Sequence, residues 1–135
     1  MNFSRKVRQQ LREPNYKNVF SGVSLDPSSQ SVESWNTTKG GGYVAAGVGG
    51  GITGKGAHVL VIDDPVKNRE DAESEYNRDS VWDWYTPTAY TRLAPGGGVL
   101  VILTRWHDDD LAGKLLSAAA AGADQWEVVL SLIHI

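Results

Sequence analysis

Hydrophobic and polar residues follow one another in blocks along this chain, and the blocks predict strands and helices in turn. The most apolar block, residues 59–62, is rich in β-branched side chains and is followed at once by Asp63, Asp64 and Pro65. Such a run predicts a strand that is buried on both faces, as in the centre of a parallel sheet. Proline cannot continue a central strand, so both carboxylates are expected at the strand's C-terminal edge, where open α/β sheets bind ligands.

Two further apolar runs predict two more strands, and amphipathic segments predict the helices between them. Residues 98–103 follow a turn at 94–97 and end in Thr104 and Arg105, and residues 126–129 start a third strand. One helix is predicted over 68–85, from an Asn68 N-cap to the stop at Thr86-Pro87. The other begins at the acids 108–110, buries Leu111, Leu115 and Ala119, and stops at Gly122.

The N-terminal third has a different pattern. Residues 4–12 predict a short basic helix with Ser4 as N-cap and Glu13-Pro14 as its end. Residues 34–38 and 42–48 predict two strands joined by a turn at 39–41. The order strand, helix, strand, helix, strand in the rest of the chain indicates an α/β fold with a mainly parallel sheet.

Composition limits the function classes. The chain has 135 residues, a formal net charge of −3 and no cysteine, so we expect one domain or a piece of one, no disulfide framework and only local contact with nucleic acid. No apolar run approaches the roughly 20 residues of a membrane span, and residues 1–6 lack the apolar region of a signal peptide. These features predict a soluble, intracellular protein without membrane contact.

A glycine-rich stretch, residues 49–56, imitates a phosphate-binding loop. It fits G-x-x-x-x-G-K-[ST] except at the last position, where Gly56 replaces the hydroxyl residue that binds Mg²⁺. A phosphate loop also has to open a helix, whose amides hold the anion, whereas this stretch leads into the predicted strand at 58–62. We therefore interpret it as a connection that enters the central strand.

The two acids after that strand are the leading candidates for chemistry. Nucleoside triphosphatases use a strand that ends in acids to hold Mg²⁺ and to orient water, although Asp and Pro are also ordinary turn residues. His107 and the three acids after it suggest a metal cluster at first sight. Successive helical residues point in different directions, however, so helix capping is the better account of residues 108–110.

Several blocks together resemble the large subunit of tailed-phage terminases, the motor that packages DNA into procapsids. The resemblance rests on their order and separation and covers nearly the whole chain to about Val129; the blocks are residues 47–57, 62–68, 82–85, 91–93 and 103–111. It implies a partial RecA-like P-loop ATPase domain of the additional-strand catalytic acid class, residues 1–129. It also implies that the phosphate loop precedes Met1 and that a nuclease domain follows, so that this fragment alone is inactive.

The resemblance assigns roles to four residues. Asp63 would hold the Mg²⁺ that accompanies ATP, and Asp64 would orient the attacking water, although many ATPases have the longer glutamate there. Thr104 and Arg105 fall in the family's coupling motif, which senses the γ-phosphate and passes hydrolysis on to DNA movement. The implied partners are double-stranded DNA, the portal protein, the small terminase subunit and further copies in a ring. The implied location is the host cytoplasm, at the procapsid portal during packaging and not in the mature virion.

One expectation about the C-terminus and two alternative functions stay open at this point. Residues 130–135 depart from the family and match a translated sequencing-library transposon end, so we expect a non-native tail there. A metal-dependent nuclease using Asp63, Asp64 and residues 108–110 would cleave DNA without ATP. A non-enzymatic module that binds nucleotide or DNA would fit a fragment that lacks its phosphate loop.

Overall fold

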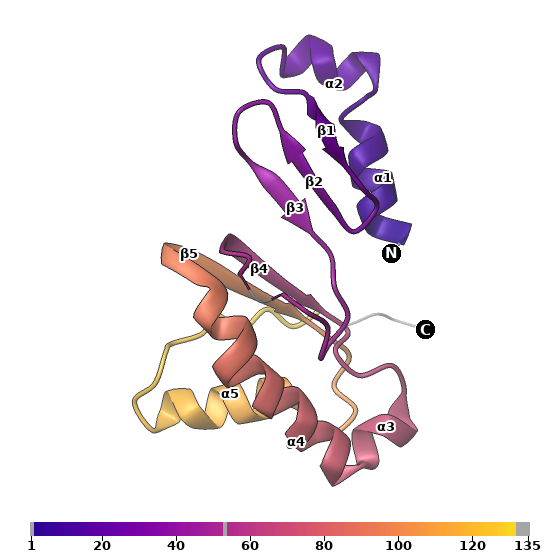
Figure 1. Cartoon of the computed structure of the whole chain (residues 1–135). Helices are drawn as coiled ribbons and strands as arrows, with labels where there is room; N and C mark the ends of the chain where they lie inside the picture. The colour runs from indigo at the N-terminus through magenta and orange to yellow at the C-terminus, as the bar shows by residue number, and fades with distance from the viewer. Residues whose placement is uncertain (1, 53, 132–135) are drawn as a thin grey trace. The chain divides into compact units, whose positions relative to one another are not determined.

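The computed structural model describes residues 2–52 and 54–131, and they form two compact units, Met1–Lys55 and Gly56–Ile135 (Figure 1). The first unit contains α1 (Asn2–Gln10) and α2 (Pro14–Val19). Its antiparallel sheet has the order β1 (Leu25–Gln30), β2 (Ser34–Thr37), β3 (Gly42–Val44). The second unit pairs two parallel strands and adds helices, so the α/β class is confirmed while the sheet is parallel only there.

The predicted hairpin of the first unit is confirmed. Trp35 pairs with Tyr43 across β2 and β3, and the two rings stack 5.1 Å apart with their planes 2° from parallel. Gly40, in the turn between the strands, has φ +80°, a conformation that glycine adopts without the strain of a side chain. Trp35 is buried, so this stacked pair forms the centre of a small core.

The prediction that Ser4 caps the first helix was wrong. Helix α1 begins earlier, and Ser4 lies inside it, buried, with its hydroxyl donating to the carbonyl of Val32. One turn further on, Arg8 donates to the backbone oxygen of Gln30, and Arg12, just beyond the end of α1, donates to the side-chain oxygen of the same residue. These hydrogen bonds therefore join α1 and the turn after it to the end of β1 and the residues that follow it. Pro14 starts α2 instead of only ending α1, because the first turn of a helix tolerates a missing N–H.

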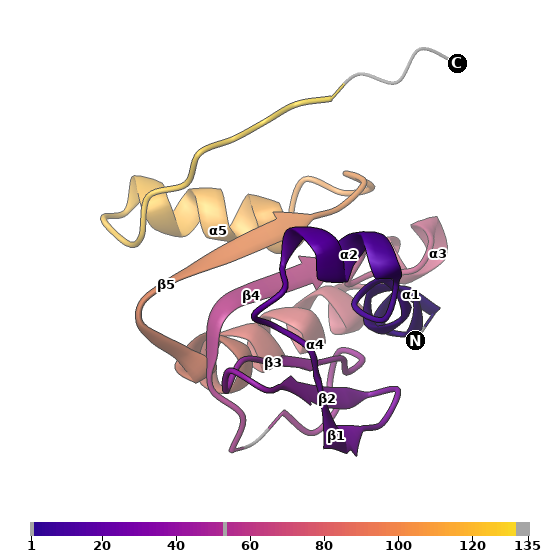
Figure 2. The same cartoon turned by 90° about the horizontal axis from the view of Figure 1, so that it is seen from above.

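In the second unit β4 (Ala57–Asp63) and β5 (Leu93–Ile102) lie side by side and parallel (Figures 1 and 2). The register runs from Val59 opposite Gly98 to Asp63 opposite Ile102. The predicted turn at 94–97 is an irregular stretch within β5, with Gly96 at φ +77°. A Cβ on Gly97 would come within 2.8 Å of the carbonyl oxygen of His58 in β4, so glycine is required there.

The prediction that β4 is buried on both faces was wrong. Ile62 is 4% exposed, whereas Val59 and Val61 are 68% and 52% exposed. Helices α4 (Glu75–Trp84) and α5 (Leu111–Ala120) lie on one side of the two strands (Figure 1). Because neighbouring strand residues point to opposite faces, the covered face takes Ile62 and the open face takes the two valines.

The helix predicted over 68–85 is two helices. Asn68 caps α3 (Arg69–Glu73) as predicted, and its side chain accepts a 2.8 Å bond from the Asp71 amide. The chain then becomes extended at Ser74, whose hydroxyl caps α4 by accepting from the amide of Asn77. A second N-cap residue inside the predicted helix therefore divided it.

Thr86-Pro87 does not stop the second of these helices, contrary to prediction. The chain continues through a π-helical turn, Tyr85–Ala89, and a short 3₁₀ helix, Tyr90–Arg92. Thr86 donates its hydroxyl to the carbonyl of Trp82, and Tyr85 and Ala89 are buried. Burial also raises the pKa of Tyr85 to about 12. Core packing by these two side chains offsets the amide that proline lacks.

Helix α5 matches its prediction except at Ala119, which is half-buried and not buried. Asp110 is its N-cap, Leu111 and Leu115 are buried, and Gly122 follows its end at φ +97°. The strand predicted at 126–129 was wrong: in the part of the chain that the structure describes, residues 123–131 pair with no strand. Val129 and Leu130 are 84% and 80% exposed, because no neighbouring strand supplies a partner. Residues 132–135 of the predicted tail lie outside the described residues.

Replacing the α5 cap should destabilise the second unit. Asp110→Ala removes both the cap and the Arg105 ion pair, and the free energy of unfolding should fall by about 1–2 kcal/mol. Asp110→Asn keeps a capping side chain and should recover most of the loss. Urea denaturation followed by circular dichroism measures the free energy of unfolding of both variants. Equal losses in the two variants would refute capping as the main stabilising contribution of Asp110.

Candidate active site

The parallel register brings the two predicted acids to the end of β5. Asp63 lies opposite Ile102, and the amide of Asp64 donates a 2.9 Å bond to the carbonyl of that same residue. Both acids are solvent-exposed. Asp63 and Asp64 are therefore presented at the carboxyl ends of both strands, where the sequence placed them.

Asp64 has an unusual backbone conformation. Its φ of +43° is the one positive value at a non-glycine residue in the described chain. Aspartate and asparagine tolerate this left-handed region better than most residues. The following Pro65 disfavours a helical conformation at the residue before it, so the turn is held under constraint. Backbone of this kind is often found at functional sites, which makes Asp64 a stronger candidate than its exposure alone would.

Thr104 and Arg105 follow the end of β5 and lie near the acids. An open groove of about 750 Å³ is lined by Asp64, Thr104 and Arg105 together with parts of β5, α5 and residues 126–131. Three of the four predicted site residues thus border one groove. Asp63 does not line this groove, and only the strand register places it near the other three residues.

Arg105 is oriented by the start of α5. Its Nε lies 2.6 Å from Oδ2 of Asp110, and its Nη2 donates a 3.2 Å bond to the carbonyl of Asp108. The same Asp110 accepts the Gly113 amide with its other oxygen. One buried carboxylate therefore fixes both the helix terminus and the arginine, which confirms the capping account of this acidic run.

The candidate acids lack the cationic partners that some other acids of the same unit have. No ion pair among the described residues involves Asp63 or Asp64, whereas Asp109 approaches both Arg78 and Lys114. Residues 2–52 and 54–131 also contain no group of three metal-ligating side chains. The site accordingly offers two unpaired carboxylates, which suits an ion that takes its remaining ligands from water and substrate.

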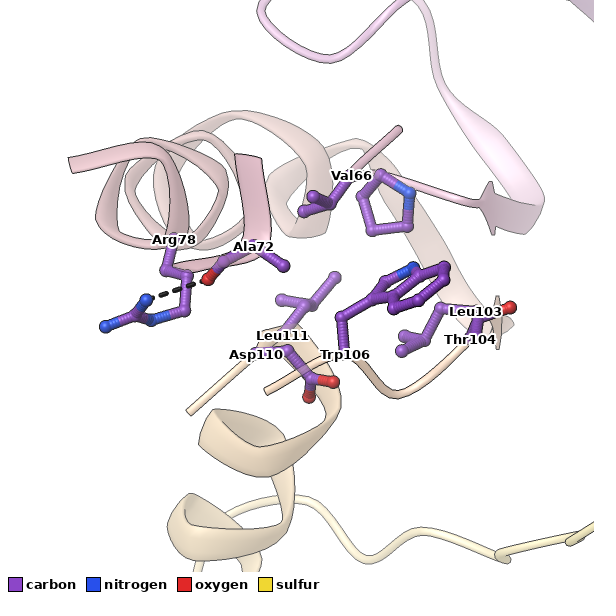
Figure 3. A pocket seen from close by; sticks show the side chains of 9 residues that line it. Val66, Ala72, Arg78, Leu103, Thr104, Trp106, Asp110 and Leu111 are labelled. Atoms are coloured by element: carbon purple, nitrogen blue, oxygen red, sulfur yellow. Dashed lines mark hydrogen bonds between the residues drawn. The ribbon is translucent and has the colours of Figure 1, made fainter. Parts of the chain in front are cut away.

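A small apolar crevice of about 20 Å³ underlies the loops that carry these residues (Figure 3). Val66 and Ala72 line it from the α3 side, and Leu103, Trp106 and Leu111 line it from the other. A space of this size holds at most one water molecule, so it is a packing contact between the two loops.

A family model described as "Terminase large subunit, T4likevirus-type, N-terminal" matches residues 2–130. The chain belongs to this family. The family implies a role in phage DNA packaging, and the match runs through both compact units. No curated protein and no solved structure matches the chain.

Charged residues that the sequence did not single out hold together the segments around the candidate site of this terminase chain. Arg78 of α4 donates to the carbonyls of Ala72 and Glu73, at 2.8 and 2.9 Å, and so satisfies the exposed end of α3. Its Nε also lies 3.5 Å from Asp109. The available signal was a lone arginine four residues after Ser74, in a segment otherwise rich in acids.

Lys114 completes this network. Its Nζ lies 2.7 Å from Asp79 of α4 and 3.6 Å from Asp109. The bond to Asp79 raises the pKa of Lys114, partial burial opposes the rise, and Asp109 adds to it. The network links α4, α5 and the loop that follows β5, and thereby sets where Thr104 and Arg105 lie. Within the described residues, no helix is long and apolar enough to cross a membrane.

The raised pKa of Lys114 predicts alkaline destabilisation. The folded pKa lies above the ordinary value of 10.5, so the contribution is fully present below pH 10.5 and is lost as pH rises through the folded pKa. Lys114→Met should be less stable than the natural chain at pH 8, and the difference should shrink above pH 10.5. Urea midpoints across this range measure it. Exposed Lys67→Met is the control, and an equal pH dependence in both variants would contradict the ion-pair account.

Proposed function

We propose that this terminase chain contributes the Mg²⁺-binding and water-orienting acids of a packaging ATPase. The observation that carries the proposal is the register that brings Asp63 and Asp64 together at the end of β5, exposed and without cationic partners. In this role Asp63 holds the ion, usually through water, and Asp64 orients the water that attacks the γ-phosphate.

The residues present fit a magnesium ion bound together with a nucleotide. Mg²⁺ keeps several waters and is commonly held by one or two carboxylates plus substrate phosphates. Two unpaired acids meet that requirement, and a full protein cage is not needed. When bound, the ion would neutralise charge that develops on the phosphates. The left-handed turn at Asp64 would hold its short side chain in place for the water.

Thr104 and Arg105 are proposed to sense the γ-phosphate and to couple hydrolysis to DNA movement. They border the same groove as Asp64, and Arg105 is already held by Asp110 at the start of α5. A change at the phosphate that moved Arg105 would therefore pull on the α5 terminus. This connection gives the proposed coupling a mechanical route through one helix.

The proposal includes a RecA-like fold whose phosphate loop is contributed from outside these 135 residues. Residues 49–56 do not serve as that loop. They contain turns, with Gly49 and Gly54 at φ +77°, and lead into β4 instead of a helix. The backbone amides of a helix N-terminus, which hold phosphate in such loops, are therefore lacking at this position.

The two alternative functions receive less support. A nuclease that used residues 108–110 would need them for metal, but Asp109 and Asp110 are engaged by Arg78, Lys114 and Arg105. A non-enzymatic binding module leaves the strained, exposed Asp64 without a role. Within the proposed ATPase the partners are double-stranded DNA, the portal protein, the small terminase subunit and further copies in a ring, at the procapsid portal in the host cytoplasm.

Removing one carboxylate should abolish ATP hydrolysis by the intact large subunit. Asp63→Asn should lower kcat by about 100-fold or more, because metal stabilisation of charge is worth several kcal/mol and each 1.4 kcal/mol is about tenfold. Asp64→Asn should have a similar effect without disturbing the turn, since asparagine also tolerates φ +43°. Steady-state phosphate release measures both variants.

Asp83→Asn is the matched control, because Asp83 is an exposed acid on α4 away from the strand ends. It should hydrolyse ATP at the natural rate. Full turnover by Asp63→Asn would exclude the metal assignment. DNA cleavage by the 135-residue chain alone with Mg²⁺ or Mn²⁺ would favour the nuclease alternative instead.

A further inference from the structure

Charge is divided unevenly between the two units. Residues 1–55 contain seven lysines and arginines against three acids, whereas residues 56–135 contain six against thirteen. The excess in the first unit comes entirely from residues 2–24, which have five cations and one acid, Glu13. The overall charge of −3 conceals a compact basic region formed by α1 and α2.

The structure separates these cations into two groups. Arg8 and Arg12 are occupied by the oxygens of Gln30, on the side of α1 that Ser4 fastens to the β1 segment. At 3.6 residues per turn, Lys6 and Gln9 lie on the other side and Arg5 lies at the border between the two, and all three are exposed. The anchored side holds the helix rigid while the other side remains available to a ligand.

The exposed cations have no acidic partner. Among the described residues, no ion pair involves Arg5, Lys6 or Lys17. Lys6 lies over the ring of Phe3, 5.9 Å from its Nζ, and this contact leaves its charge without an acidic partner among the described residues. Exposed amide side chains accompany the cations: Gln9, Gln10, Asn15 and Asn18.

We propose that the exposed polar side chains of α1 and of the adjoining α2, here called the basic face (Arg5, Lys6, Gln9, Lys17 and Asn18), contact the phosphate backbone of double-stranded DNA. The inference rests on the proposed function, which makes DNA a partner but assigns no residue to contact it. Phosphate oxygens are bound by lysine, arginine, asparagine and glutamine side chains, the composition of this face. The face carries no base-reading arrangement, so binding is independent of sequence, as a translocated substrate requires.

Salt dependence of DNA binding tests the inference. The 135-residue chain is titrated into a fluorescent duplex of arbitrary sequence, without nucleotide, and anisotropy is followed between about 50 and 200 mM salt. The variant Arg5→Ala/Lys6→Ala/Lys17→Ala should bind about tenfold or more weakly at low salt. The slope of log K against log salt should become shallower by about 2.7, since each neutralised phosphate contributes about 0.9.

The matched control removes three exposed cations elsewhere: Lys39→Ala/Lys67→Ala/Arg69→Ala. It changes the net charge equally and should keep the natural slope. Equal losses in both variants would show a general charge effect and overturn the inference. Thermal unfolding of both variants verifies that the exposed substitutions leave the fold intact.

Two further outcomes would also overturn the inference. The first is no binding of the natural chain at low salt. The second is a change in oligomeric state with unchanged DNA affinity, measured by analytical ultracentrifugation, which would make the basic face a contact with the acidic unit of another copy. Neither result depends on ATP, so the two proposals can fail separately. If Asp63→Asn loses ATP hydrolysis while the basic-face variant binds DNA like the natural chain, the ATPase proposal stands and the DNA-contact proposal is rejected.

Discussion

The parallel pairing of β4 with β5 is the constraint on which the candidate site depends. Asp63 ends one strand and Asp64 follows it, Thr104 and Arg105 follow the other strand, and 37 residues lie between Asp64 and Ile102 along the chain. The register alone makes their positions neighbours, and the hydrogen bond from the Asp64 amide to Ile102 extends it one residue beyond the strand. Such pairing requires a crossover, which α3, α4 and the π-helical turn supply.

Charged residues determine how rigidly the crossover presents the site. Arg78 joins the end of α3 to α4, and Asp109 lies between Arg78 and Lys114. Asp110 holds Arg105 and the first turn of α5 together. Asp110 thus caps a helix and Asp109 helps to position a loop, whereas Asp63 and Asp64 form no ion pair among the described residues.

Much of this arrangement was predictable from the sequence, and the failures have physical causes. The strand at residues 59–62, the Asn68 cap, the α5 stripe and the hairpin around Trp35 follow from local periodicity and turn chemistry. Burial of β4 and the strand at 126–129 depend on neighbouring strands, which local sequence does not specify. Ser74 divided a helix because a cap residue competes with helix continuation, and Pro87 failed to end one because Tyr85 and Ala89 are buried. The roles of Asp63, Asp64, Thr104 and Arg105 remain predictions.

Gly97 helps to fix the register between β4 and β5. The carbonyl oxygens of His58 and Ala94 leave no room beside it for even a methyl group, so β5 approaches β4 closely at this point of its irregular stretch. Sliding β5 by one residue would exchange the two faces of the strand, and sliding it by two would bring Pro95 or Val99 into that gap. The absence of a side chain at Gly97, near one end of the sheet, therefore helps to keep the two acids aligned with β5 at the opposite end.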